Sequence, residues 1–76
     1  MATFTVREGR RYRATIALGL LERLASNDMI AEQLRTAGFA EVSVSGSGAV
    51  RVAQALWPAS DATAEMPKEI TEVVEI

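Results

Sequence analysis

Polar and apolar residues alternate near the start of the chain, as they do in a half-buried β-strand. Phe4 and Val6 alternate with polar neighbours in a short first segment, and the alternation resumes over residues 11–18 after a break at residues 8–10. The apolar face of the second segment consists of Tyr12, Ala14, Ile16 and Leu18. We therefore expect two strands, and the glycine in the break is compatible with a hairpin turn between them.

A helical period follows these strands, over residues 27–37. Its apolar stripe consists of Ile30, Leu34 and Ala37. Ser26 stands immediately before this segment as a favourable N-cap. At the other end, Gly38 can adopt the left-handed conformation that closes a helix, and Phe39 can then fold back on Leu34 as in a Schellman motif. The sequence therefore predicts one helix with a start signal and a stop signal.

Two further strands are predicted after the helix. Val42 and Val44 alternate with polar residues, residues 46–48 have the composition of a turn, and Val50 and Val52 open the next strand. Alternating segments joined by a short glycine-containing turn are typical of an antiparallel hairpin. We expect this hairpin to follow the helix directly.

Three remaining segments have weaker patterns. Residues 19–25 admit either a short helical turn or an apolar loop. Residues 59–67 lack periodicity and predict a loop. Residues 68–76 are rich in β-branched side chains, which favours a strand; a helix that begins at Pro67 is the alternative.

These elements predict a single small α+β domain over residues 1–76. Its core is a β-α-β-β unit, with a mostly antiparallel sheet, one main helix packed on one face, and room for extra strands at the N- and C-terminal ends. One amphipathic helix can cover only one face of a sheet. The other face must therefore be shielded by the tail, be shielded by a partner, or remain polar.

The composition limits the chemistry that the chain can perform. Its 76 residues include no histidine and no cysteine, which excludes the common zinc sites and catalytic triads. The acidic residues lack the spacing of a calcium loop, and residues 45–48 lack the pattern of a phosphate loop or a nucleophile elbow. A chain this short has little room for a water-excluding pocket beside its core. We expect no enzymatic activity, no catalytic residue, no metal site and no cofactor.

Charge is divided between the two ends of the chain. The net charge is −2, yet residues 1–25 contain five arginines against two glutamates, and residues 59–76 contain one lysine against five acidic residues. A basic strand and an acidic strand can attract each other within one chain or between two subunits. The candidate interaction surface consists of Arg7, Arg10, Arg11, Arg13, Trp57, Glu69, Glu72 and Glu75.

The arginine-rich strand admits a nucleic-acid interpretation, in which arginines hold phosphates and Tyr12 stacks on a base. In the structural interpretation, Tyr12 points to the core and the arginines face water. The negative net charge favours the structural interpretation. Trp57 also has two interpretations, a surface anchor and a packing residue, and the sequence does not separate them.

One stretch between residues 12 and 52 has the order of segments of a known family. The matching features are a first strand Tyr12-Arg13-Ala14-Thr15-Ile16, the helix segment Ala31-Glu32-Gln33-Leu34 that ends at Ala37-Gly38-Phe39, and a return strand that starts at Arg51-Val52. This stretch resembles one half of a sporulation-related repeat (SPOR) domain. The resemblance implies a small non-enzymatic α+β domain that binds the glycan strands of peptidoglycan. Because the second strand–helix–strand half is missing, glycan binding of this kind implies dimerisation.

The sequence favours a non-catalytic binding or assembly module that acts by self-association or by contact with another protein, for example as a structural component of a phage particle. A basic strand edge and the acidic tail could pair between subunits. Glycan is the alternative partner, and nucleic acid ranks below it. No apolar run is long enough to span a membrane, and no secretion signal is visible. The expected location is the cytoplasm, with a virion as the alternative.

Overall fold

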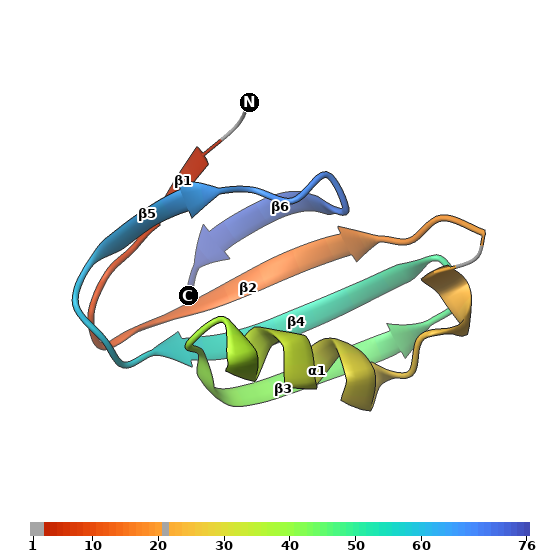
Figure 1. Ribbon diagram of the computed structural model, residues 1–76, viewed down its shortest axis with the longest axis horizontal. Coiled ribbons are helices and arrows are strands. Elements are labelled where there is room, and N and C mark those ends of the chain that lie inside the picture. Colours follow the sequence, from red (N-terminus) through yellow and green to blue (C-terminus); the bar gives the residue numbers. More distant parts are fainter. Residues whose placement is uncertain (1–2, 21) are drawn as a thin grey trace.

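The computed structural model describes residues 3–20 and 22–76, which form one helix, a short 3-10 turn and six strands (Figure 1). The elements are β1 (Thr3–Val6), β2 (Arg10–Ala17), η1 (Glu22–Leu24), α1 (Asn27–Thr36), β3 (Ala40–Ser47), β4 (Val50–Trp57), β5 (Ala62–Glu65) and β6 (Ile70–Glu75). Four strands form an antiparallel sheet in the order β3-β4-β2-β6, and β1 pairs with β5 in a separate two-stranded ribbon. The predicted α+β class with one helix and a mostly antiparallel sheet is confirmed.

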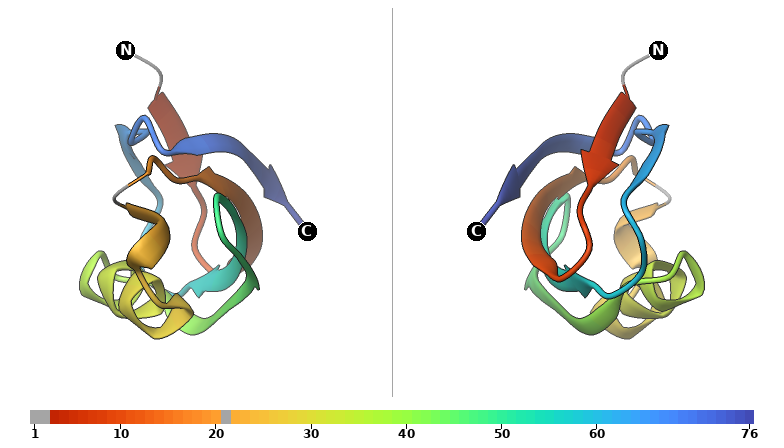
Figure 2. Two further views of the ribbon diagram at one scale, coloured as in Figure 1. Left: turned by 90° about the vertical axis from the view of Figure 1, so that its right-hand side faces the viewer. Right: turned by 90° about the vertical axis from the view of Figure 1, so that its left-hand side faces the viewer.

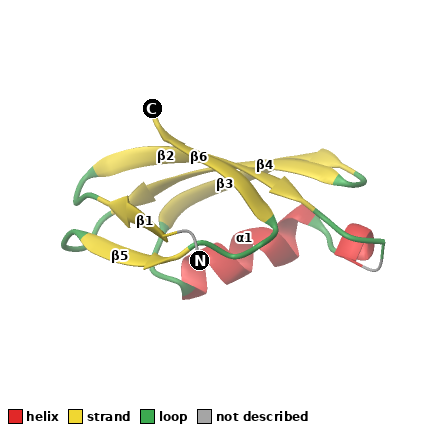
Figure 3. Cartoon of the chain, turned by 90° about the horizontal axis from the view of Figure 1, so that it is seen from above, coloured by secondary structure: helices red, strands yellow, loops and turns green. Residues whose placement is uncertain are grey.

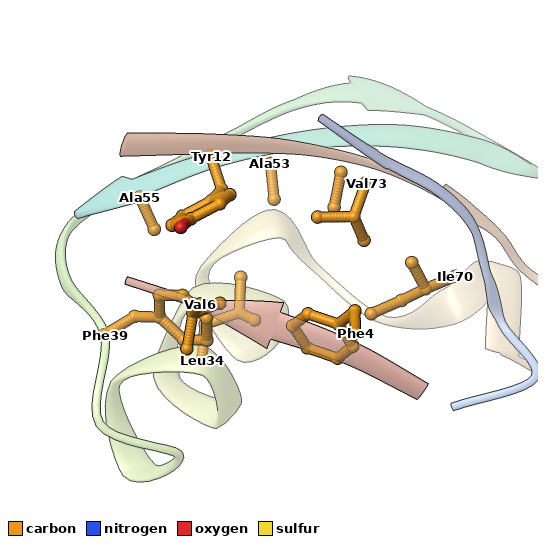
Figure 4. Close-up of a pocket in the computed structure, with 10 residues that line it drawn as sticks. Phe4, Val6, Tyr12, Leu34, Phe39, Ala53, Ala55, Ile70 and Val73 are labelled. Carbon is orange, nitrogen blue, oxygen red and sulfur yellow. The ribbon is translucent and has the colours of Figure 1, made fainter. Parts of the chain in front are cut away.

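The helix and the β1–β5 ribbon lie on the same side of the four-stranded sheet. The sheet curves around one side of the core, and α1 and the ribbon cover the opposite side of the core (Figure 2). Phe4 and Val6 of β1 and Leu34 of α1 face Tyr12 and Val73 of the sheet across this interior (Figure 4). The buried apolar residues are Val6, Tyr12, Ile16, Ala31, Ala53 and Ala55.

Both ends of the helix follow the predicted capping pattern. The Ser26 hydroxyl accepts a hydrogen bond of 3.1 Å from the Met29 amide. At the C-terminal end, the Phe39 amide donates to the Leu34 carbonyl at 3.1 Å and the Gly38 amide donates to the Arg35 carbonyl at 3.0 Å, as in a Schellman motif. Local backbone chemistry alone therefore sets the bounds of α1.

The apolar stripe of the helix differs from the prediction. Ala31 is the buried residue of α1, Ile30 and Leu34 are half-buried, and Ala37 is exposed. A small side chain at position 31 allows the helix to approach the sheet closely.

The predicted hairpin between the first two strands is wrong. A turn does occur, with the Arg10 amide bonded to the Arg7 carbonyl at 3.2 Å, but β1 leaves the plane of the sheet and pairs with β5. In that ribbon the Thr5 and Thr63 hydroxyls lie 2.7 Å apart.

The loop predicted over residues 59–67 is wrong in its centre, because β5 occupies Ala62–Glu65. Alanine and threonine give no hydrophobic alternation there, so the sequence does not indicate a strand. Residues 62–65 form one because their backbone pairs with β1. The tail at 68–76 forms the predicted strand, β6, at the edge of the sheet. The short helical turn admitted for residues 19–25 corresponds to η1, although Leu21 lies outside the described residues.

Arg51 is a buried charged residue on the inner face of β4, with 5% of its surface exposed. Its guanidinium donates three hydrogen bonds, to the Gly48 carbonyl at 3.2 Å, the Asn27 side-chain oxygen at 2.8 Å and the Arg23 carbonyl at 3.1 Å. One side chain thus joins the β3–β4 turn, the first residue of α1 and η1. These partners are neutral oxygens, which replace the water that the cation loses on burial.

Replacing Arg51 with methionine should lower the free energy of unfolding by about 2–3 kcal/mol, because three hydrogen bonds to a charged donor are lost. Arg51→Lys retains the charge but not the planar fork, so we expect a smaller loss. Urea denaturation followed by circular dichroism measures both. Two variants as stable as the wild type would contradict this role for Arg51.

Gly38 and Gly48 provide a matched pair for testing the helix end. Both have positive φ, 114° and 70°, but a Cβ on Gly38 would lie 3.1 Å from two ring carbons of Trp57, whereas a Cβ on Gly48 would meet nothing within 4 Å. Gly48→Ala should cost about 1 kcal/mol of backbone strain. Gly38→Ala should cost about 2–3 kcal/mol because φ of 114° lies outside the left-handed basin and because the ring must also move. Equal losses in thermal or urea unfolding would show that the contact with Trp57 is unimportant.

Candidate interaction face

The side of the four-stranded sheet that faces away from α1 and the ribbon is uncovered by residues 3–20 and 22–76 (Figure 3). Side chains alternate along each strand, so the burial of Ala53 and Ala55 places their neighbours on this outer side. We call it the open face. By register its residues are Arg11, Arg13, Thr15 and Ala17 of β2, Ser43, Ser45 and Ser47 of β3, Val50, Val52, Gln54 and Leu56 of β4, and Glu72 and Val74 of β6.

Three apolar side chains of β4, Val50, Val52 and Leu56, belong to the open face. Val50 is 55% exposed, and Val52 and Leu56 are half-buried. The inner face of the same strand carries Arg51 and Ala53 instead. As far as Leu56, the strand therefore presents its bulkier apolar residues to the outer side and small or charged residues to the core, while Trp57 at its end faces inward.

The tail does not shield the open face. β6 pairs with β2 and extends the sheet, with Thr15 opposite Glu72 and Tyr12 opposite Glu75. The sequence left three possibilities for this face: cover by the tail, cover by a partner, or a polar surface. In the single chain the face is partly polar, with serine and arginine side chains around an apolar centre that stays accessible.

The predicted arginines divide between two places. Arg11 and Arg13 lie on the open face, where Arg11 forms an exposed ion pair of 3.4 Å with Glu41. Arg7 and Arg10 lie at the turn between β1 and β2, and both are exposed. An exposed pair of this kind contributes little to the free energy of folding. The side chains of these arginines therefore determine the charge of the surface more than the stability of the fold.

Tyr12 is not available for base stacking. Only 8% of its surface is exposed, and its hydroxyl accepts a hydrogen bond of 2.6 Å from the Arg7 amide. The structural interpretation of this residue is confirmed. A nucleic-acid contact through this strand would have to do without its only aromatic ring.

The acidic residues of the tail lie beside the arginine strand in the same chain. Glu72 belongs to the open face, Glu75 points to the other side of the sheet, and Glu69 immediately precedes β6. The predicted pairing of these two strands between subunits is wrong in the structure, because β2 has β4 on one side and β6 on the other. The basic strand has no free edge.

Trp57 packs within the protein and is not part of the open face. Its ring meets Phe39 edge to face, with centroids 5.0 Å apart and planes at 66°. Its indole nitrogen donates to the Ser60 carbonyl at 2.8 Å. The packing interpretation of this half-buried tryptophan is the one that the structure supports.

One apolar cavity, between the sheet, the helix and β1, is small, ≈ 40 Å³ (Figure 4). Tyr12 supplies the single titratable side chain of its lining, and that hydroxyl is already bound to the Arg7 amide. The cavity therefore offers packing space and no group for acid–base or nucleophilic chemistry.

The part of the chain that the structure describes contains no group of three or more acidic residues placed to hold a metal ion. No helix in that part is long and apolar enough to cross a membrane. Comparisons with protein-family models, curated proteins and solved structures found no match. The resemblance to a SPOR half-domain stays a prediction.

The sequence singled out Arg11, Arg13 and Glu72 but missed the valines and the leucine at the centre of the open face. Val50 and Val52 have the sequence pattern of core residues, but the structure places them on the outer side of the sheet and Arg51 on the inner side. We call this reversal the inversion on β4. Arg51, between the two valines, has the polarity typical of a solvent-facing position, and it is buried only because the folded chain brings the oxygens of Arg23, Asn27 and Gly48 to it.

Lysine substitutions at adjacent positions of β4 test this orientation. Val52→Lys should change the free energy of unfolding by less than about 1 kcal/mol, because the side chain can extend into water. Ala53→Lys, one residue later, should cost at least about 4 kcal/mol or abolish folding, because Ala53 is 3% exposed. Similar losses in urea denaturation would mean that both faces of β4 are buried.

Proposed function

We propose that this protein is a non-catalytic assembly module that uses the open face for contact with a protein, either a second copy or another chain. The observation that carries the proposal is the inversion on β4. Val50, Val52 and Leu56 point away from the core, while Ala53 and Ala55 point into it. A partner that covers apolar area in the middle of the sheet gains roughly 25 cal/mol for each Å² removed from water.

The composition of the open face supports a protein partner. It has an apolar centre and a polar rim, an arrangement common to protein interfaces. The rim carries both signs of charge, with Arg13 on β2 and Glu72 on β6. A surface that neutralises phosphates would have one sign only, so the rim favours protein over nucleic acid.

The small size of the domain also supports an assembly role. Among the described residues, no large side chain is fully buried, and a chain of this length buries only about 60% of its unfolded surface. Covering the open face would add apolar burial that the monomer lacks. A structural component of a larger particle, a phage particle included, is consistent with these properties.

Site-specific photo-crosslinking tests the proposal. A photoreactive amino acid replaces Gln54, at the centre of the open face, or Gln33, on the exposed side of α1. Irradiation of cells that naturally make the protein should give a covalent adduct from position 54 and none from position 33. The mass of the adduct distinguishes a second copy from another protein. The proposal fails if position 54 gives no adduct, or if both positions give the same products.

A further inference from the structure

The four-stranded sheet has two edge strands, β3 and β6. They differ in whether their outward backbone N–H and C=O groups are accessible to another strand. The edge of β3 is blocked at both ends. A register shift interrupts the strand between Ala40 and Ser43, where Glu41 has φ of 50°. Near the other end, the Asn27 side chain donates to the Gly46 carbonyl at 3.1 Å. Bulges and occupied carbonyls of this kind prevent another strand from pairing.

The edge of β6 has no such protection over its second half. The Ile76 amide donates to the Arg11 carbonyl at 2.9 Å. Because hydrogen-bonding directions alternate along a strand, Val73 and Glu75 direct their N–H and C=O groups away from β2. The irregularity of β6 falls at Thr71, before this stretch. The end of β6 projects from the body of the molecule (Figure 2).

Charge does not prevent two copies of this edge from meeting. Glu72 and Glu75 lie on opposite sides of the sheet: Glu72 is diagonal to Arg13 on the open face, and Glu75 lies opposite Tyr12 on the inner side. The two glutamates therefore do not form one acidic surface, and Arg13 partly offsets the charge of Glu72.

We propose that β6 pairs with β6 of a second copy in antiparallel orientation, centred on Val74. This inference rests on the proposed function and names its self-associating surface. In this register Val74 lies opposite the partner's Val74, Val73 opposite the partner's Glu75, and Glu72 opposite the partner's Ile76. No two glutamates are directly opposite, and Glu75 and the partner's Glu75 are diagonal neighbours on the inner side, so the pairing avoids the directly opposed like charges that destabilise strand pairs.

The pairing would join two four-stranded sheets into one sheet of eight strands. The outward groups of Val73 and Glu75 would form hydrogen bonds with their counterparts across the two-fold axis. Ile76, which is 52% exposed, would be covered by the aliphatic part of the partner's Glu72. The two open faces would then lie on one continuous sheet, doubling the surface offered to a partner.

Sedimentation equilibrium on the purified full chain tests this pairing, from about 1 µM to about 1 mM, the range suited to a small interface. The wild type should pass from monomer to dimer. Glu75→Pro removes the outward amide of residue 75 without touching the bonds to β2, and should raise the dissociation constant at least about tenfold. The matched variant Glu75→Ala keeps the amide and removes a diagonal pair of like charges, so it should dimerise at least as tightly as the wild type.

Hydrogen exchange gives a readout that needs no variant. The amides of Val73 and Glu75 should exchange quickly in dilute solution and become protected as the concentration rises, while the amide of Val74, which points to β2, should be protected throughout. A wild type that stays monomeric over the whole range overturns the inference. It is also overturned if Glu75→Pro and Glu75→Ala behave alike.

The failures of the two proposals can be told apart. A dimer that is lost in Val52→Lys but kept in Glu75→Pro would place self-association on the open face, against the edge pairing and in favour of the proposed function. Crosslinking from position 54 reports on the open face whether or not β6 pairs, because Gln54 lies on β4, away from that edge.

Discussion

The buried guanidinium of Arg51 determines how the rest of the sheet is presented. Its three hydrogen bonds require the side chain to point to the inner side of β4, towards α1 and the β3–β4 turn. Side chains alternate strictly along a strand, so a slip by one residue would reverse every position. With Arg51 inside, Val50 and Val52 must lie outside. One polar anchor therefore decides which apolar residues form the core and which form the open face.

The core that results is built from small side chains. Ala31 of α1 and Ala53 and Ala55 of β4 are buried, and they allow the helix to lie close to the sheet. The bulk comes from Tyr12, Ile16 and the ribbon. β1 and β5 cover the part of the inner face that one short helix cannot reach, which explains why a pair of four-residue strands leaves the plane of the main sheet.

The open face and the β6 edge are two consequences of this arrangement. Because both covering layers lie on the inner side, nothing in the described chain is left for the outer side. Because Asn27 and the irregularity at Glu41 occupy the edge of β3, the unpaired backbone groups suited to a new strand are those of β6. The proposed protein contact and the proposed edge pairing would therefore share Glu72 and Val74.

Local chemistry in the sequence was sufficient for the helix and for most of the strands. Ser26 and Gly38 mark the ends of α1 through contacts within a few residues, and the alternation around Tyr12 marks β2 and its inner face, since both signals depend only on neighbours in the chain. Pairing partners were decided by the tertiary structure: β1 left its sequence neighbour for β5, and the acidic tail joined β2 of its own chain. The orientation of β4 was decided there too, because the oxygens that satisfy Arg51 come from Arg23, Asn27 and Gly48, and only the folded chain brings the first two to β4. Strand pairing and buried hydrogen bonds depend on contacts between distant segments, and no pattern read along a single strand contains them.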